Sequence, residues 1–104
     1  MSNIIIEYVY IKIVNEVKYT KDELFGFIKA SFNRQKILLA LNGKDMTPLE
    51  IAKVTDLALS NVTKILGDLK KKNLVQCKTP RLRKGRIYTL TEDARELVSL
   101  LMSK

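Results

Sequence analysis

The alternation of apolar and polar residues between positions 58 and 72 predicts an amphipathic helix. Val62, Ile65, Leu66 and Leu69 recur at the i, i+3, i+4, i+7 spacing that gathers side chains on one face of an α-helix. The opposite face is mostly short, polar or cationic, and it carries Ser60, Asn61, Thr63, Lys64, Gly67 and Lys71. Amide, hydroxyl and ammonium groups suit base edges and phosphates in a major groove. A solvated face on an ordinary helix is the alternative.

A second helix is predicted immediately before this one. Thr47 and Glu50 have the spacing of a capping box, and Pro48 occupies the favoured first helical position. The helix should end near Thr55, which leaves residues 56–58 for the turn. Two helices joined by three residues form a helix-turn-helix unit, here over residues 47–72.

A β-hairpin and a final helix are predicted beyond residue 72. Asn73 tolerates the left-handed conformation that ends a helix. Residues 74–78 and 86–90 have strand composition and flank the loop 79–85, so a two-stranded hairpin is expected over residues 74–90. Thr91 should cap a last helix over residues 91–104, with acidic residues in its first turn, where the helix dipole favours anions.

The N-terminal part is predicted to contain one ambiguous segment and two helices. Residues 3–19 are rich in Ile, Val and Tyr and partly alternate, which indicates a strand; a helix buried at a dimer interface is the alternative. Thr20 and Glu23 form a capping box for a short helix. Ser31 is a candidate cap for the next helix, which should stop at residues 42–43. We therefore expect a single domain of residues 1–104, α+β and mostly α.

The net charge of +8 is concentrated in one third of the chain. Residues 53–86 contain ten Lys and Arg against two Asp, whereas the segments on either side are nearly neutral. Such a field attracts polyanions, either nucleic acid or an anionic membrane surface. Four of these cations surround the Pro/Gly loop of the hairpin: Arg81, Arg83, Lys84 and Arg86. They repel one another unless a polyanion lies near, so contacts to phosphates or a minor groove are predicted.

The residue types used in catalysis and metal binding are scarce. The chain has one cysteine, Cys77, and no histidine, so no triad, metal site or internal disulfide can be assembled. Its paired acidic residues are explained as first-turn residues of helices. We expect no enzymatic activity, no metal and no cofactor. The N-terminal segment is too short and too charged for a membrane span and lacks a signal-peptide pattern, so a cytoplasmic location is expected.

The helix-turn-helix segment and the start of the hairpin have a recognisable set of residues: Ala52, Leu57, Ser60, Val62, Leu66, Leu69, Leu74 and Val75. At these positions the chain resembles the DNA-reading core of the ArsR and MarR regulator families. Residues 88–92 also look like the end of a MarR-type wing that runs into the C-terminal helix. The resemblance covers residues 33–98. It implies a winged helix-turn-helix fold with a two-stranded β-wing, and double-stranded DNA as the partner.

Three departures from the family pattern affect this interpretation. Asp56 stands where the families usually have a turn glycine, although Asp can adopt the required backbone geometry. Ala58 replaces the usual Ser or Thr cap of the reading helix, so that helix is expected to fray at its start or to be capped by water. The Cys and His clusters of ArsR metal sensors are missing, which disfavours a regulatory metal.

The resemblance implies that the face from Leu59 to Lys64 enters the major groove. Asn61 would pair with adenine, Lys64 with guanine or a phosphate, and Ser60 and Thr63 with either. N-terminal capping of the helix is the alternative role for Ser60. The expected DNA-binding residues are Leu59, Ser60, Asn61, Thr63, Lys64, Lys71, Arg81, Arg83, Lys84 and Arg86.

The end of the same helix has a simpler interpretation. Residues 70–72 are all lysine, and at least one of them is expected to serve only as a solubilising helix end that complements the helix dipole. Asp68 would repel phosphate, so it is expected to pair with Lys64 or Lys72 at i±4.

The sequence thus predicts a sequence-specific DNA-binding transcriptional regulator. Residues 4–14 and 94–102 contain more apolar surface than a domain of this size covers alone, so a two-fold homodimer is expected. Two alternatives remain: a winged-helix module whose basic face meets an acidic protein, and a chromatin-like protein that coats DNA without specificity. No residue pattern identifies a small-molecule effector or the operator.

Overall fold

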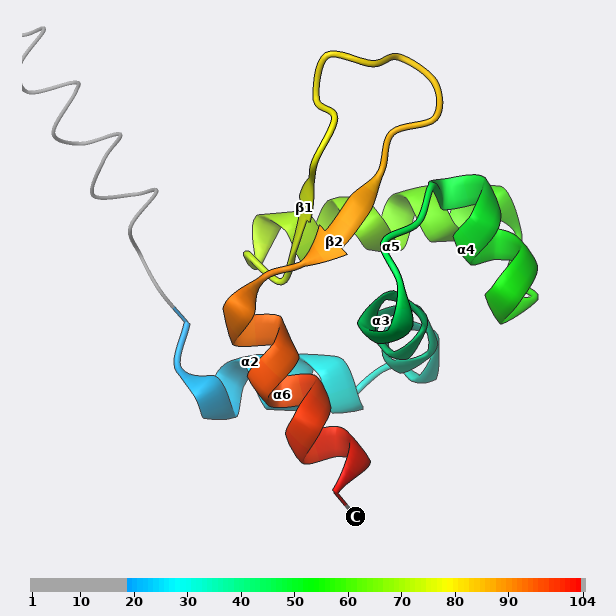
Figure 1. The fold of residues 1–104 in the computed structure, drawn as a ribbon. Helices are drawn as coiled ribbons and strands as arrows, with labels where there is room; N and C mark the ends of the chain where they lie inside the picture. Colours follow the sequence, from blue (N-terminus) through cyan, green and yellow to red (C-terminus); the bar gives the residue numbers. More distant parts are fainter. Residues whose placement is uncertain (1–18, 104) are drawn as a thin grey trace, which may run out of the picture.

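The computed structural model describes residues 19–103, which form a helical body with a projecting β-hairpin (Figure 1). In chain order the elements are α2 (Lys21–Lys29), α3 (Phe32–Gly43), α4 (Pro48–Thr55), α5 (Leu59–Lys71), β1 (Val75–Cys77), β2 (Tyr88–Leu90) and α6 (Glu92–Met102). The expected α+β, mostly helical architecture is confirmed. The strand or helix expected over residues 3–18 lies outside the described residues.

The helices begin where the sequence predicts. Side-chain caps are present at Thr20, Ser31, Thr47 and Thr91. At Thr47 the hydroxyl accepts the Glu50 N–H at 3.2 Å, and the Glu50 carboxylate accepts the Thr47 N–H at 2.9 Å. Thr20 and Glu23 repeat this arrangement. In both boxes the backbone N–H of the threonine lowers the pKa of the glutamate. These caps satisfy N–H groups that a helix start otherwise leaves open.

Two residues in the left-handed conformation bracket α5. Asp56 has a φ of 58° and takes the place of the glycine common in this turn, and Asn73 has a φ of 57° just after the helix. Asp and Asn adopt this region more easily than most other non-glycine residues. The tight helix-turn-helix and the sharp exit into β1 therefore form as the sequence predicts.

The wing is an antiparallel pair in which Val75 lies opposite Leu90 and Cys77 opposite Tyr88. Its strands are shorter than predicted, although hydrogen bonds between the two arms continue outside the strands, for example from the Lys78 N–H to the Ile87 carbonyl at 2.7 Å. An isolated antiparallel β-bridge between Met46 and Tyr88 also pairs the α3–α4 connection with β2. This bridge fixes the root of the wing to the helical body.

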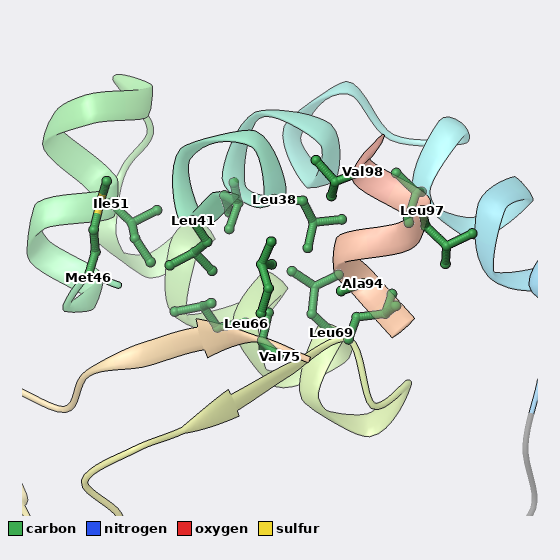
Figure 2. Close-up of a cluster of buried hydrophobic side chains, with 14 of the residues drawn as sticks. Leu38, Leu41, Met46, Ile51, Leu66, Leu69, Val75, Ala94, Leu97 and Val98 are labelled. Atoms are coloured by element: carbon green, nitrogen blue, oxygen red, sulfur yellow. The ribbon is translucent and has the colours of Figure 1, made fainter. Parts of the chain in front are cut away.

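One hydrophobic core lies beneath all of these elements (Figure 2). Its buried members are Leu24, Ile28, Ile37, Leu38, Leu41, Met46, Ile51, Val62, Leu66, Leu69, Leu74, Val75, Leu90, Ala94, Leu97 and Val98. The apolar stripe of α5 contributes three fully buried residues, while Ile65 is half-buried at its edge. Burial of this stripe therefore determines which side of α5 faces outward.

The helix α6 differs in part from the prediction that residues 94–102 leave a broad apolar surface uncovered. Ala94, Leu97 and Val98 are buried in the domain's own core, whereas Leu100 and Met102 remain more than half exposed. Helices α2 and α6 lie at the end of the molecule opposite the wing (Figure 1). Within the described part of the chain, no helix is long and apolar enough to cross a bilayer.

Candidate nucleic-acid interface

The outer face of α5 presents every polar residue expected to read DNA. Ser60, Asn61, Thr63 and Lys64 are all exposed, and 46% of the Leu59 side chain is exposed beside them. These polar residues face outward because the apolar stripe on the other side of α5 is buried in the core. The first turn and a half of the helix can therefore meet a partner without any rearrangement of the body.

The start of α5 has no side-chain cap. The N-cap is Ala58, which has no acceptor to offer, so the alternative role of Ser60 as a cap is not found. The Thr63 hydroxyl donates to the Ser60 carbonyl at 3.0 Å, which leaves only its lone pairs for an outside donor. Backbone N–H groups in this turn remain open to an anion, as at other helix N-termini.

The end of α5 is fastened to α2. The Lys72 ammonium lies 3.9 Å from the centre of the Tyr19 ring and 5.2 Å from that of Phe27, while Arg34 stacks on Phe27 at 3.7 Å. The expected pairing of Asp68 with Lys64 or Lys72 was wrong, because Lys72 is held by these aromatic rings instead. Lys72 thus packs against aromatic rings, which is a structural role other than the solubilising helix end expected for at least one of the three lysines.

The wing loop exposes its cations and is internally braced. Arg81, Arg83 and Lys84 are exposed, whereas Arg86 is half-buried and its Nε donates to the Leu82 carbonyl. Of the four predicted loop cations, Arg86 also supports the loop, and the other three make no hydrogen bond or ion pair with their side chains among residues 19–103.

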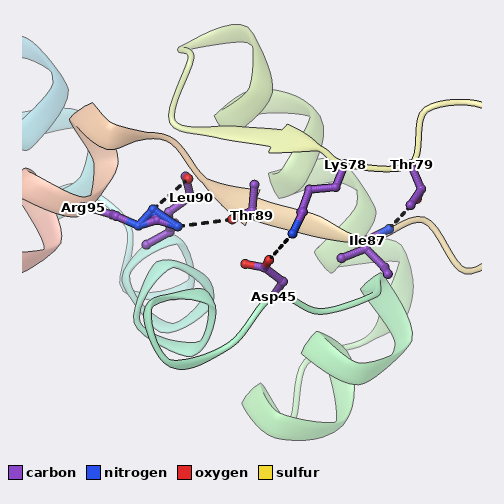
Figure 3. A network of polar contacts seen from close by, with 7 residues as sticks. All are labelled: Asp45, Lys78, Thr79, Ile87, Thr89, Leu90 and Arg95. Atoms are coloured by element: carbon purple, nitrogen blue, oxygen red, sulfur yellow. Dashed lines mark hydrogen bonds and ion pairs between the residues drawn. The ribbon is translucent and has the colours of Figure 1, made fainter.

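A polar network holds the root of the wing against the body (Figure 3). Lys78 donates to the Asp45 carboxylate at 3.0 Å, and Arg95 of α6 donates to the Thr89 hydroxyl at 3.4 Å. Hydrogen bonding to Thr89 lowers the pKa of the Asp45 carboxyl most, and hydrogen bonding to Lys78 lowers it further. The network ties the hairpin both to the α3–α4 connection and to α6.

Sequence reasoning missed the residues that set the wing's position. Asp45 and Arg95 belong to other elements of the fold, so no local pattern points to them. Thr79 had a detectable signal, because a Thr-Pro pair at a loop start favours a side-chain-to-backbone turn. Its hydroxyl accepts the Ile87 N–H at 2.9 Å and closes the neck of the loop.

The cations of the interface are almost all without carboxylate partners. Between residues 19 and 103, the ion pairs are Lys21–Glu96 and Lys78–Asp45. The reading helix and the tip of the wing contribute to neither of them. Positive charge in this region is therefore available to an external anion, since no carboxylate among residues 19–103 neutralises it.

Metal and thiol chemistry find little support in the part of the chain that the structure describes. No group of three metal-ligating side chains is found there. Cys77 is half-buried in β1, with its Sγ 3.9 Å from the Thr79 Oγ1, and serves as a small strand residue.

The fold is similar to that of solved winged helix-turn-helix proteins. The homodimeric winged helix-turn-helix DNA-binding domain of Mycobacterium bovis Mb0332, a possible ArsR-family transcriptional regulator, superposes with a TM-score of 0.68 at 25% identity, over 80% of this chain and 76% of that one. S. aureus MepR in its DNA complex superposes with a TM-score of 0.65 at 19% identity, over 80% of this chain and 71% of the MepR chain. Lactococcus lactis ZitR in complex with DNA superposes with a TM-score of 0.62 at 21% identity, over 85% of this chain and 53% of the ZitR chain.

The similarity has clear bounds. The chain spans about half the length of the ZitR structures that it matches. No protein-family model and no curated protein matches the sequence. The expected fold is nevertheless confirmed: residues 19–103 form a winged helix-turn-helix domain similar to those of Mb0332 and MepR.

Proposed function

We propose that this protein is a sequence-specific regulator of transcription that binds double-stranded DNA as a homodimer. The observation that carries the proposal is the combination of an exposed polar face on α5 with wing cations that have no carboxylate partner among residues 19–103. Both lie on the one segment that holds the chain's excess charge. A field of this kind draws the domain to phosphates, and the amide and hydroxyl groups of α5 can then distinguish bases.

The helix and the wing have separate tasks in this proposal. Asn61, one turn into α5, reads adenine in the major groove, with Ser60, Thr63 and Lys64 beside it. Arg81, Arg83 and Lys84 contact phosphates or the minor groove next to the site. Lys71 and Arg86 add backbone contacts from the end of α5 and the neck of the loop. The braced loop supports this division, because it presents its cations from a fixed frame.

The solved structures support DNA as the partner. MepR and ZitR have both been solved with DNA bound, and Mb0332 is a homodimeric DNA-binding domain. Identities of 19–25% support a class of partner, and they carry no information on the operator sequence or an effector. The role proposed is non-catalytic, without a cofactor, and in the cytoplasm.

The exposed apolar residues of α6 support the dimer. Leu100 and Met102 are 52% and 60% exposed, and the Asn42 amide lies 3.5 Å from the Met102 Sδ, which brings the ends of α3 and α6 together. A two-fold dimer through this end would place two reading helices on half-sites about 34–36 Å apart. Light scattering at micromolar concentration should give twice the mass of the chain; a monomer would contradict this part of the proposal.

Selection of bound sequences from a pool of random duplexes tests the proposal most directly. An enriched inverted repeat would support a dimeric regulator. Binding without any enriched motif would favour a protein that coats DNA, and no binding at all would favour a module that contacts other proteins. The selection should be repeated at two salt concentrations, because phosphate contacts dominate at low ionic strength and obscure base preference.

A further inference from the structure

The tip of the wing contains an apolar residue that lies outside the hydrophobic core of residues 19–103. Leu82 is 47% exposed and lies between Arg81 and Arg83. Among residues 19–103 it belongs neither to the buried core nor to the apolar side chains that pack against the core. One exposed leucine on a surface is ordinary, so its exposure alone indicates nothing. Its backbone surroundings are more informative.

The main chain of Leu82 is held on both sides. Its N–H donates to the Thr79 carbonyl at 3.1 Å, and its own carbonyl accepts the Arg86 Nε–H. The Thr79 hydroxyl also closes the neck of the loop by accepting the Ile87 N–H at 2.9 Å. Both polar groups of the Leu82 backbone are thus occupied within the loop. These bonds fix the backbone, so the exposed side chain of Leu82 would meet a partner from a fixed position.

The neighbours of Leu82 determine what that partner can be. Arg81, Arg83 and Lys84 are exposed and have no carboxylate partner within the described residues. They would bring the tip against phosphates, and a minor groove is lined by phosphates on both sides. A leucine side chain cannot hydrogen-bond to base edges. Apolar side chains that enter a minor groove act instead as wedges between neighbouring base pairs.

We propose that Leu82 enters the minor groove beside the operator half-site and partly separates one base step, with its flanking cations on the phosphates. This inference rests on the proposed function and deepens it. The reading helix recognises bases directly, whereas Leu82 would recognise how easily the flanking DNA deforms. Pyrimidine–purine steps such as TA unstack easily and A-tracts are stiff, so the wing would prefer a TA step at this position.

The test uses duplexes built on the consensus from the random-sequence selection, with either a TA or an AA step under the wing. The adenine of that step is replaced by 2-aminopurine, whose fluorescence rises when it unstacks. Affinities of the full chain are measured by anisotropy over a range of salt concentrations. Wild type should raise the emission at the TA step and should bind the TA duplex about tenfold more tightly than the AA duplex.

Three variants separate a wedge from a simple contact. Leu82→Ala should lose both the emission change and the TA preference, while the dependence of affinity on salt stays as in wild type. Leu82→Met keeps a long apolar side chain and should retain both signals. Lys84→Ala is the matched control: it should keep the TA preference but flatten the slope of log affinity against log salt by about 0.9 for each phosphate that it leaves without a cation.

The outcomes also separate this inference from the proposed function. If wild type binds its consensus but shows no emission change, or if Leu82→Ala keeps the TA preference, the wedge is refuted and the regulator stands. If wild type binds no duplex in the selection, the regulator itself is refuted. Misfolding can be checked from the thermal melting curve, which Leu82→Ala should leave unchanged because Leu82 lies outside the core.

Discussion

The two ends of this domain share one core but differ in surface charge. The end formed by α4, α5 and the wing carries the chain's excess positive charge, although Val54, Leu59 and Leu82 are exposed there as well. The helices α2, α3 and α6 of the other end contain as many acidic as basic residues, and that end exposes Phe32, Leu100 and Met102. Leu38, Leu66 and Leu97 connect the two ends in a continuous interior. The buried pattern therefore determines the fold, and the exposed residues of each end determine what it can bind.

The two surfaces should respond differently to solution conditions. Attraction between exposed charges extends over about 10 Å at 0.1 M salt and over shorter distances as the salt concentration rises. Burial of apolar surface acts only at contact and is much less sensitive to moderate salt. Binding through the wing should thus weaken steeply with salt, whereas association through α6 should not. A substitution at one end can therefore be judged with the other end as its reference.

The largest effect is expected at the apolar end. Leu100→Glu places a charge on the exposed face of α6 and should prevent dimerisation without disturbing the core, because the side chain is 52% exposed. The operator would then be bound by single domains, and affinity should fall by a factor of about 10²–10⁴. Analytical ultracentrifugation and anisotropy measure the two quantities.

Ser99→Glu is the matched control, because it adds the same charge to the neighbouring residue without removing apolar surface. It should affect dimerisation less than Leu100→Glu. If Leu100→Glu remains dimeric, the interface is not formed by this part of α6.

The second prediction concerns the reading face of α5. Asn61→Ala removes an exposed amide that can make two hydrogen bonds to adenine, so it should cost on the order of 1–3 kcal/mol on the preferred site. Binding to random DNA should change little. Equal reductions on both kinds of DNA would show that the helix makes only phosphate contacts, which would favour a coating protein.

The third prediction concerns the wing's charge. Arg83→Ala should weaken binding to preferred and random DNA alike, because a phosphate contact carries no sequence information. The slope of log affinity against log salt should flatten by roughly 0.9 for each phosphate that Arg83 neutralises in wild type. If Arg83→Ala instead changes the preferred sequence and leaves the slope unchanged, this side chain reads bases.

The smallest effect is expected at the root of the wing. Hydrogen bonding to Thr89 and the ion pair with Lys78 lower the pKa of Asp45, so the folded state favours the carboxylate. The resulting stability is present above the ordinary pKa of an aspartate and is lost as the pH falls through the lower value of the folded protein. Asp45→Asn should therefore destabilise by about 0.5–1 kcal/mol at pH 7, a modest figure because solvent screens this partly exposed pair.

Urea unfolding of wild type and Asp45→Asn at pH 7, 5 and 3 measures this difference. It should be constant between pH 7 and 5 and should shrink at pH 3. A difference that is unchanged at pH 3 would mean that the charge of Asp45 does not hold the wing.

Local patterns in the sequence predicted most of the fold for identifiable reasons. A capping box such as Thr47-Glu50 is complete within four residues, and the α5 stripe repeats over only two turns, so both can be recognised without tertiary information. Asp56 shows the same principle, because its side chain tolerates the left-handed geometry that the turn requires. The strand ends were less well predicted, since pairing at residues 78 and 87 depends on the loop that joins them.

The candidate site was predicted in composition but not in arrangement. Its exposed residues on α5 could be predicted from the apolar stripe, because the residues opposite a buried helix face are the exposed ones. The partners of Lys72 and Lys78 could not be predicted, because Tyr19 and Asp45 lie far from them in the sequence and meet them only in the folded domain. Charge spacing at i±4 gave Lys64 or Lys72 as the partner of Asp68, but Asp68 pairs with neither, and Lys72 contacts an aromatic ring instead.

The unequal ends of α5 have a thermodynamic consequence. Lys72 fixes the last turn against two aromatic rings, whereas the first turn, which carries Ser60 and Asn61, has no side-chain cap. We expect that first turn to sample open conformations in the free protein. Restricting each such residue costs about 1–2 kcal/mol of conformational entropy at 25 °C. Only a DNA site that gives Ser60 and Asn61 hydrogen-bonding partners would offset that cost, so the missing cap would increase discrimination between operator and random DNA at some expense of affinity for both.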